Sequence, residues 1–357
     1  MKCDIVIPVW NNKGMTGPCI NSIFTNTHCD YGITIIDNAS DLPTRIYLDE
    51  VKARYPGKIT LIRNQENIGN VKAANQGIAA SIADYVCILD NDTLVFDDWL
   101  SEMMQVAESS KEIGIVGPHS NSGKRKPWNK SYQLYAREMT AGKQGQYAEA
   151  ASVIGFCYLI KREVISKIGM WDERFSPGYF EDTEYCFRAR EAGYMSVFAK
   201  GAFVFHFEHV SFRKRGFDVL FKQSEKRFYY LHKRPQRVLY ILTNPSNRYY
   251  NQIKQDSYNL AKNSNWVTIY LKKSAPKIDL SNHVGVKKLH FYDMLFNFIA
   301  IVKVLAKKKK FSKILVDSNN LAAVLISSKR YHGAEVNLIN HYKKDVLEDF
   351  CKNPLSG

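Results

Sequence analysis

The sequence of 357 residues lacks the patterns that mark several specialised classes of protein. Its seven cysteines include no C-x-x-C pair and no zinc-finger spacing, so we expect reduced thiols in a cytoplasmic protein. The longest apolar stretch, residues 294–305, is broken by Asn297 and Lys303 and falls short of the ~20 residues of a membrane-spanning helix. The first residues lack the pattern of a signal peptide, and we expect no export.

Acidic residues are scarce in the second part of the chain. Residues 1–200 contain 22 Lys and Arg against 24 Asp and Glu, whereas residues 201–357 contain 28 against 11. The two balances, −2 and +17, give the overall charge of +15. A basic surface is typical of proteins that bind nucleic acid or an anionic membrane, but it also serves solubility. No zinc finger, RNA-recognition signature or helix-turn-helix pattern accompanies the charge, so we expect no nucleic-acid partner.

One basic segment combines charge with apolar side chains. Residues 291–311 are rich in aromatic and aliphatic residues, and four consecutive lysines, Lys307 to Lys310, lie near their end. This pattern is typical of a helix that lies on an anionic membrane surface. A buried helix whose last lysines complement its C-terminal dipole gives the same pattern. Both alternatives stay open, and with them a peripheral location at the inner face of the cell membrane.

Short apolar runs alternate with helical patterns through the first 100 residues, which predicts an α/β fold with a mostly parallel sheet. We expect strands at residues 4–8, 33–37, 60–63 and 85–89, and helices near residues 15–26, 43–55 and 69–83. Ligands of open α/β sheets bind outside the carboxyl ends of the strands. We therefore expect one site formed by the polar clusters that follow these strands, at residues 10–12, 37–38, 64–67 and 90–92.

A second block runs from Ile113 to about Leu231, with an expected strand at residues 202–207. The alternation then restarts after Lys233, Arg234 and Pro235. It predicts strands at residues 237–242, 266–271, 313–317 and 335–339, and helices at residues 248–262, 294–309 and 320–330. We therefore predict one domain over residues 1–234 and a smaller Rossmann-like α/β domain over residues 235–357. The second domain contains neither G-x-G-x-x-G nor a P-loop, so no motif supports nucleotide binding there.

Three motifs carry residues suited to chemistry, and each has a structural alternative. Asp90-Asn91-Asp92 follows an apolar strand and suits a magnesium or manganese ion that bridges to a diphosphate, but it is also a common turn. Glu181-Asp182 opens an amphipathic helix, where an ionised carboxylate can act as a general base or form an ordinary acidic first turn. His206 and His209 lie where they could complete a metal site or be half-exposed core residues.

Together these motifs resemble glycosyltransferase family 2, the inverting nucleotide-sugar transferases of GT-A fold, over about residues 3–215. The subgroup most similar is the bacterial rhamnosyltransferase-type enzymes of surface-polysaccharide assembly. Relatives often have Asp where this chain has Glu184, which leaves the role of that position open. The resemblance rests on segments in the family's order: residues 5–11, 36–41, 67–77, 90–92, 169–175, 181–182 and 204–206.

The resemblance implies a role for each matching position. Pro8, Trp10 and Asn11 would line the base pocket, Asp37 would bond the pyrimidine edge, Asn67 and Lys72 would flank the nucleotide, and Asp90, with Asn91 beside it, would approach the ribose or the metal. Asp92 would ligate the metal, with His206 as third ligand and His209 as a fallback. Asp182 would be the catalytic base, with Glu181 orienting the acceptor. For Pro8, Trp10, Gly69 and Gly77 the alternative is packing and turn geometry, which we favour for Gly77.

The resemblance thus implies a hexosyl- or deoxyhexosyltransferase that uses Mn2+ or Mg2+ and a nucleoside-diphosphate sugar of the UDP or dTDP type. The acceptor would be a hydroxyl of a saccharide or a lipid-linked glycan. A non-catalytic carbohydrate-binding or scaffolding protein of the same fold is the alternative. Residues 235–357 resemble the N-terminal half of a GT-B-type transferase domain, which leaves open that the chain is part of a longer bifunctional enzyme.

Overall fold

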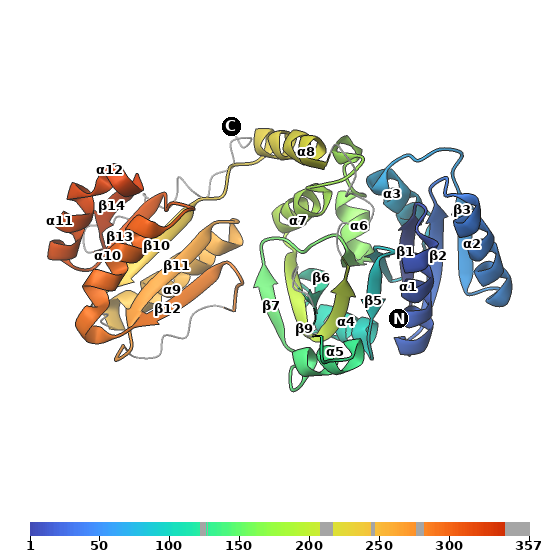
Figure 1. Ribbon diagram of the computed structural model, residues 1–357, viewed down its shortest axis with the longest axis horizontal. Coiled ribbons are helices and arrows are strands. Elements are labelled where there is room, and N and C mark those ends of the chain that lie inside the picture. Colours follow the sequence, from blue (N-terminus) through green and yellow to red (C-terminus); the bar gives the residue numbers. More distant parts are fainter. Residues whose placement is uncertain (122–125, 127, 208–216, 244–246, 276–281, 340–357) are drawn as a thin grey trace. The chain divides into compact units, whose positions relative to one another are not determined.

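The computed structural model describes residues 1–121, 126, 128–207, 217–243, 247–275 and 282–339. It divides into two compact units, Met1–Tyr230 and Leu231–Gly357, a few residues before the boundary predicted between residues 234 and 235. Each unit has its own sheet with helices on both faces, as the ribbon shows (Figure 1). The expected fold class, a large mixed α/β sheet followed by a second α/β unit, is confirmed.

The first unit contains a nine-stranded mixed sheet. Its strands are β1 (Cys3–Val9), β2 (Tyr31–Asp37), β3 (Ile59–Arg63), β4 (Tyr85–Leu89), β5 (Thr93–Val95), β6 (Ile113–Ser120), β7 (Tyr147–Ala150), β8 (Cys157–Lys161) and β9 (Met195–His206). Neighbouring strands follow the order β3-β2-β1-β4-β8-β6-β9-β5, and β7 also pairs with β9. Strands β1 to β4 are parallel, whereas β8 is antiparallel to β4 and β5 is antiparallel to β9.

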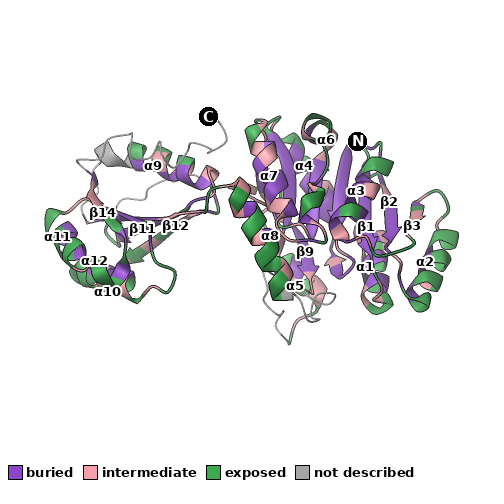
Figure 2. Ribbon diagram, turned by 90° about the horizontal axis from the view of Figure 1, so that it is seen from above, coloured by how far each residue is buried: buried purple, intermediate pink, exposed green. Residues whose placement is uncertain are grey.

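Two apolar layers cover this sheet, and its central strands, such as β1 and β4, are almost wholly buried (Figure 2). Helices α1 (Lys13–Asn26), α2 (Leu42–Arg54) and α4 (Trp99–Glu108) pack on one face. Helices α3 (Asn70–Ala80), α6 (Arg162–Ile168) and α7 (Glu181–Glu191) pack on the other. The unit also contains α5 (Tyr132–Thr140), the 3-10 turn η1 (Glu173–Phe175) and α8 (Phe217–Leu231). Burial on both faces explains why β4 is an unbroken apolar run and why β1 is apolar from Ile5 to Val9.

Helix α3 lies unusually close to the sheet, and a glycine makes this possible. A Cβ atom on Gly77 would lie 2.2 Å from Cγ1 of Val6 in β1, which is closer than side-chain atoms can approach. The packing role that we favoured for Gly77 is therefore confirmed. The close approach places the N-terminus of α3, which begins at Asn70, beside the carboxyl ends of β1 and β2.

The second unit is a five-stranded parallel sheet in the order β12-β11-β10-β13-β14. The strands are β10 (Arg237–Leu242), β11 (Trp266–Lys272), β12 (Val286–Phe291), β13 (Lys313–Val316) and β14 (Glu335–Leu338). One face packs on α9 (Asn247–Lys262) and the other on α10 (Phe296–Ala306) and α11 (Asn319–Ser327). The short η2 (Asp293–Leu295) and α12 (Lys329–His332) complete the described part. The helix predicted at residues 320–330 is thus divided between α11 and α12.

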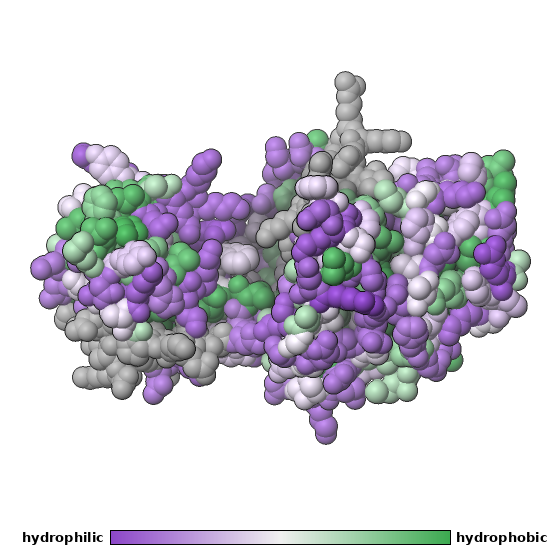
Figure 3. All heavy atoms as spheres, turned by 60° about the horizontal axis from the view of Figure 1, so that its bottom comes forward, coloured by the Kyte–Doolittle hydropathy of each residue, from purple (hydrophilic) through white to green (hydrophobic). Residues whose placement is uncertain are grey.

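Helix α10 answers part of the question raised by its sequence. It buries Phe296, Ala300 and Val304 against the sheet but exposes 66% of Phe298 and 44% of Val302. Figure 3 shows apolar side chains gathered on the surface at the end of the second unit that carries α10 to α12. Nζ of Lys310 donates to the carbonyl of Leu305, as expected of a lysine that caps a helix C-terminus. Among the described helices, none is long and apolar enough to cross a membrane.

Candidate active site

Two carboxylates and an imidazole meet at the carboxyl end of β4. Asp90 and Asp92 follow this strand directly, and His206 is the last residue of β9. Nε2 of His206 lies 3.2 Å from Oδ1 of Asp92 and 3.8 Å from Oδ2 of Asp90. One ligand atom from each of the three residues lies within 4.8 Å of the others. Burial and the neighbouring Asp92 raise the pKa of Asp90 to about 7, and His206 partly offsets this rise.

The backbone and ring of His206 are held from several sides. Antiparallel pairing of β5 with β9 sets His206 opposite Thr93, one residue after Asp92. The His206 amide donates to Oδ1 of Asn121, and Nδ2 of Asn121 donates back to the His206 carbonyl, at 2.9 and 3.0 Å. The ring of Phe156 stacks on the imidazole, with centroids 4.7 Å apart and planes inclined by 14°. These contacts orient the imidazole toward the two carboxylates.

Asp182 reaches the same region from the first turn of α7. Its Oδ2 accepts a 2.7 Å hydrogen bond from the Gly155 amide, and its Oδ1 accepts bonds from the amide and hydroxyl of Thr183. The next residue, Phe156, accepts a 2.8 Å hydrogen bond from the Asp90 amide at its carbonyl oxygen, and its ring stacks on His206. Residues 155–156 thus connect Asp182 with the cluster of Asp90, Asp92 and His206. Burial raises the pKa of Asp182, although these hydrogen bonds oppose the rise.

Glu181 is a buried carboxylic acid beside Asp182. It is 7% exposed, and its Oε2 accepts no hydrogen bond from any residue that the structure describes. Burial and the neighbouring Asp182 raise its pKa well above the usual range. The turn before it is strained, because Tyr179 and Phe180 have φ angles of 75° and 69°. A left-handed backbone costs on the order of 1–2 kcal/mol per non-glycine residue.

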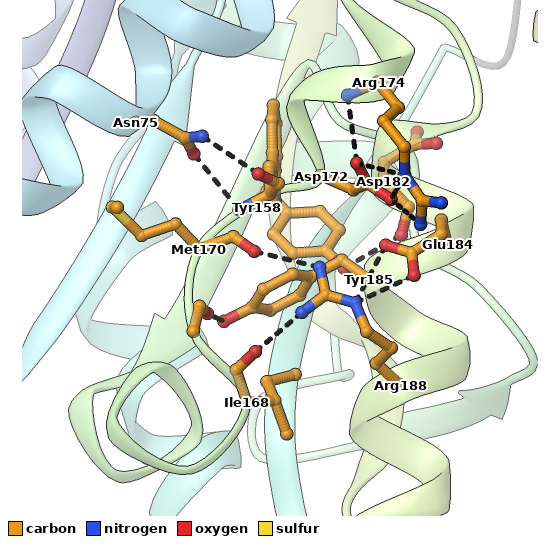
Figure 4. Close-up of polar contacts among 12 residues, drawn as sticks. Asn75, Tyr158, Ile168, Met170, Asp172, Arg174, Asp182, Glu184, Tyr185 and Arg188 are labelled. Carbon is orange, nitrogen blue, oxygen red and sulfur yellow. Dashed lines mark hydrogen bonds and ion pairs between the residues drawn. The ribbon is translucent and has the colours of Figure 1, made fainter.

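Glu184 is a structural residue in this chain. Both of its carboxylate oxygens accept bonds from Nε of Arg188, at 2.8 and 2.9 Å, as Figure 4 shows. The other nitrogens of Arg188 donate to the carbonyls of Ile168 and Met170. The pair therefore ties α7 to the loop after α6. Both carboxylate oxygens of Glu184 contact Arg188, and this arrangement supports a structural role for the pair.

The polar clusters after β2 and β3 form one amide network. Nδ2 of Asn38 donates to Oδ1 of Asn67, while Oδ1 of Asn38 accepts from Asn64 and from the Ile68 amide. Asp37 is 1% exposed and accepts bonds from the Ser40 amide and from Nε of Arg63, each at 3.0 Å. The predicted convergence of these two clusters is therefore present, and Arg63 is a member that the sequence reading missed.

The other predicted positions lie around this network. Pro8 is buried in β1, Trp10 is 39% exposed, and Lys72 is exposed on α3. Oδ1 of Asn11 accepts a hydrogen bond from the Asp41 amide, and this bond links the segments that follow β1 and β2. Asn91 points toward α1, because its Nδ2 donates to the hydroxyl of Thr16 at 2.8 Å. His209 lies outside the described residues.

Three residues that organise the site were not anticipated. Gly155, Phe156 and Asn121 lie in loops, and each acts mainly through its backbone, an amide group or a ring face. The sequence around the first two reads only as an apolar run, residues 151–160. Nothing in that run distinguishes an aromatic ring that stacks on a histidine of the site from one that fills the apolar core.

Comparisons with known proteins agree with this architecture. An uncharacterized glycosyltransferase of Nostoc sp. (strain PCC 7120) is 30% identical over 116 residues, which cover 32% of this chain and 36% of the relative. The amylovoran biosynthesis glycosyltransferase AmsB of Erwinia amylovora is 22% identical over 213 residues, or 54% of this chain and 65% of the relative. The chain thus spans about a third to two thirds of the length of these curated relatives.

A crystal structure of GalNAc-T7 with UDP, GalNAc and Mn2+ matches with a TM-score of 0.52 at 17% identity, covering 65% of this chain and 48% of that one. At this identity the likeness shows the fold alone, and it confirms the expected GT-A type. The model of the family described as "Glycosyl transferase family 2" matches residues 4–169, which include β1 to β4, Asp90, Asp92 and Gly155. The first unit of this chain therefore contains the region, residues 4–169, that this family model matches.

Proposed function

We propose that the first unit is a metal-dependent inverting glycosyltransferase. It moves a sugar from a nucleoside-diphosphate sugar of the UDP or dTDP type to a hydroxyl of a cell-surface glycan precursor. One observation carries this proposal: Asp90, Asp92 and His206 converge within 4.8 Å, and residues 155–156 join them to Asp182. The companion proposal for the domains is that residues 1–234 perform transfer and that residues 235–357 have a separate role.

The donor atoms at the cluster fit a small divalent cation. Two carboxylates and one imidazole suit Mn2+, and a hard cation of this kind also accepts diphosphate oxygens. Asp92, Asp90 and His206 would hold the ion, and the ring stack of Phe156 would fix the orientation of the imidazole. When bound, the ion supplies positive charge that offsets the charge developing on the departing diphosphate.

Asp182 then performs the proton transfer. Its carboxylate takes the proton of the acceptor hydroxyl as the hydroxyl oxygen bonds to the anomeric carbon. The bond between that carbon and the β-phosphate oxygen breaks, and its electron pair leaves with the nucleoside diphosphate. A single displacement from the opposite face inverts the anomeric configuration. Glu181, buried beside Asp182, would orient the acceptor as a neutral acid, in line with its raised pKa.

The ends of β1, β2 and β3 would bind the nucleotide. We assign Pro8, Trp10 and Asn11 to the base pocket, Asp37 to the pyrimidine edge, and Asn67 and Lys72 to the flanks. Asp37 would act together with Arg63, because the 3.0 Å ion pair between them fixes the carboxylate. Lys72 is an exposed cation on the first turn of α3, which suits an approaching phosphate. Asp90, with Asn91 beside it, would lie at the ribose and metal side.

The acceptor would be a saccharide or a lipid-linked glycan presented at an anionic membrane surface. The second unit supports this part of the proposal, because residues 231–357 contain 22 Lys and Arg against 8 Asp and Glu. The exposed Phe298 and Val302 on α10 precede Lys308 and Lys309, which are also exposed. Apolar side chains beside lysines are the combination that holds a protein peripherally at anionic lipid. The similarity to rhamnosyltransferases and to half of a GT-B-type domain stays a prediction.

The test uses the full chain, both as wild type and as Asp92→Asn. Calorimetry measures the binding of Mn2+ and of a panel of nucleotide sugars, and an activity assay measures turnover of the donor. We expect wild-type turnover to require the metal, and Asp92→Asn to lose both metal affinity and turnover. Asp30→Asn is the matched control, because Asp30 is exposed and lies before β2, at the opposite end of the strands. Full turnover of Asp92→Asn in chelator would contradict the metal assignment. Donor binding without any turnover would favour the non-catalytic carbohydrate-binding alternative.

A further inference from the structure

The turn that precedes Asp182 is held by a helix that lies outside the family match. We propose that one face of α8, formed by Phe221, Ser224 and Phe228, positions Asp182 for proton transfer by bracing residues 178–180. This inference rests on the proposed function, in which Asp182 is the base. The three side chains are spaced i, i+3 and i+7, so they share one face of the helix.

The turn needs support from elsewhere in the fold. Tyr179 and Phe180 are consecutive aromatic residues with φ angles of 75° and 69°, a conformation that side chains of this size rarely adopt. Phe180 is also the residue before α7, and its side chain makes no capping hydrogen bond to the helix. The first turn of α7, which carries Glu181 and Asp182, therefore depends on contacts that keep this strained turn in place.

Helix α8 supplies those contacts. The ring of Phe180 stacks on Phe228 at 5.1 Å and contacts Phe221 at 5.4 Å, and Tyr179 meets Phe221 edge to face at 5.7 Å. The hydroxyl of Ser224, which is 5% exposed, donates to the Gly178 carbonyl at 3.1 Å. Phe228 also contacts Phe187 farther along α7, at 5.2 Å. Rings at these separations attract one another beyond simple burial.

Residues 176–177, which precede the turn, are held by the start of α3 and the loop before it. The Pro177 carbonyl accepts the Asn70 amide at 3.0 Å, and the Ser176 hydroxyl donates to the Ile68 carbonyl. No side chain fits at Gly69, since a Cβ there would lie 2.9 Å from Cα of Pro177, and its φ is +86°. Residues 176–180 are therefore fixed by the start of α3 at one end and by α8 at the other.

Small movements of this turn would act on the base directly. Asp182 is the second residue of α7, and its Oδ2 depends on a 2.7 Å bond from Gly155 to stay beside the metal-ligating cluster. Loss of the brace should displace Asp182 while it leaves Asp90, Asp92 and His206 in place, because these three are held by β4, β5 and β9. A displacement of about 1 Å can lower turnover about 100-fold.

The test uses Phe228→Ala and Ser224→Ala in the full chain, with Tyr230→Ala as matched control, since Tyr230 lies on the same helix and is 88% exposed. We expect kcat to fall about 10- to 100-fold in Phe228→Ala, with donor KM and Mn2+ affinity unchanged, and Phe228→Leu to restore part of the loss. Ser224→Ala removes one hydrogen bond and should give a smaller fall in kcat. Tyr230→Ala should match wild type.

A second readout does not depend on catalysis. Hydrogen exchange should become faster at the amides of residues 179–184 in Phe228→Ala and stay unchanged at residues 85–93. Two results would contradict the proposed role of α8. One is a parallel loss of Mn2+ affinity, donor affinity and kcat. The other is unchanged kcat and unchanged hydrogen exchange in both variants. A failure of the proposed function can be distinguished from a failure of this inference. If Asp182 is not the base, Asp182→Asn should have the turnover of wild type, while the exchange rates still show whether α8 holds residues 178–180.

Discussion

Both units contain parallel strands covered by helices, yet their strand ends carry different chemistry. In the first unit, Asp90, Asp92 and His206 gather at one end of the sheet, and Asp182 lies beside them. In the second, Oδ1 of Asp317 after β13 accepts bonds from the amide and hydroxyl of Thr243 after β10, which is a local strand-end contact. Metal-ligand groups of three or more residues occur in the described parts only at Asp90, Asp92 and His206.

The length and pairing of β9 account for this difference. His206 reaches the end of β4 because β9 runs for 12 residues and pairs with the short β5 directly after Asp92. The described second sheet is parallel throughout. Charge separates the units as well: residues 1–230 contain 28 Lys and Arg against 27 Asp and Glu, whereas residues 231–357 contain 22 against 8. The first unit is thus organised around a site, and the second presents a basic surface.

The largest expected effect comes from Asp182→Asn in the first unit. Asparagine keeps the size of the side chain but cannot take a proton, so kcat should fall about 10²- to 10⁴-fold with donor affinity close to wild type. The acid limb of the wild-type kcat profile should lie above the usual aspartate pKa of about 3.9, since burial raises the pKa of Asp182. Steady-state kinetics across pH measures both. Retained turnover would move the role of base to Glu181.

Next in size is a loss of stability confined to the first unit. Glu184→Gln leaves Arg188 without its carboxylate partner, and charged hydrogen bonds of this kind contribute about 1.5–3 kcal/mol. Thermal unfolding should show a lower midpoint than wild type, with the metal affinity preserved. Glu163→Gln, an exposed glutamate on α6, serves as control. A kcat loss in Glu184→Gln at unchanged stability would instead give this residue a direct role in the reaction.

The basic surface of the second unit is tested with lipid vesicles. Replacing Lys308 and Lys309 with Gln should weaken binding to anionic vesicles by about 2 kcal/mol, roughly 30-fold, because each lysine near such a surface contributes about 1 kcal/mol. Added salt should weaken wild-type binding in the same direction. Co-sedimentation measures both effects, with Lys52→Gln and Lys111→Gln on the first unit as the charge-matched control. Equal binding to neutral and anionic vesicles would leave the lysines a role in solubility alone.

The smallest expected effect is a gain in stability from Glu181→Gln. Burial raises the pKa of Glu181 in the folded state. Such a carboxyl group makes its full contribution to the free energy of unfolding below its unfolded pKa, and this contribution is lost as pH rises through the folded pKa. The neutral amide avoids that loss, so the variant should be more stable than wild type by about 0.5–2 kcal/mol near pH 8. The gain should shrink at pH 5. Lower stability of the variant at both pH values would indicate that Glu181 is ionised and stabilised in the fold.

The sequence predicted the fold best where burial leaves the strongest pattern. The strands expected at residues 4–8, 33–37, 60–63 and 85–89 match β1 to β4 closely, because buried parallel strands are continuous apolar runs. The edge strand β12 was missed, since the consecutive Lys287 and Lys288 in Val286–Phe291 break both a continuous apolar run and a strict alternation. Likewise β9 begins seven residues before the predicted strand, because Ser196, Lys200 and Gly201 interrupt its apolar pattern.

The candidate site followed the same logic. Carboxylates and histidines at strand ends and helix starts are visible in a sequence, so the positions of Asp90, Asp92, Asp182 and His206 could be proposed in advance. Contacts made by ring faces and backbone groups leave no such pattern. The stacking of Phe156, the double hydrogen bond of Asn121 and the brace by α8 therefore required the structure.

The anomeric configuration of the transferred sugar is the most direct test of a single displacement with Asp182 as the base. With one base, Asp182, and a single displacement, the product formed from an α-linked donor must be β-linked. Nuclear magnetic resonance of the product during the first turnovers, with Mn2+ and the donor that the panel identifies, measures this configuration before any rearrangement. We expect this configuration to be inverted. A product with retained configuration would contradict it, because retention by double displacement requires a second nucleophile on the opposite side of the sugar from Asp182.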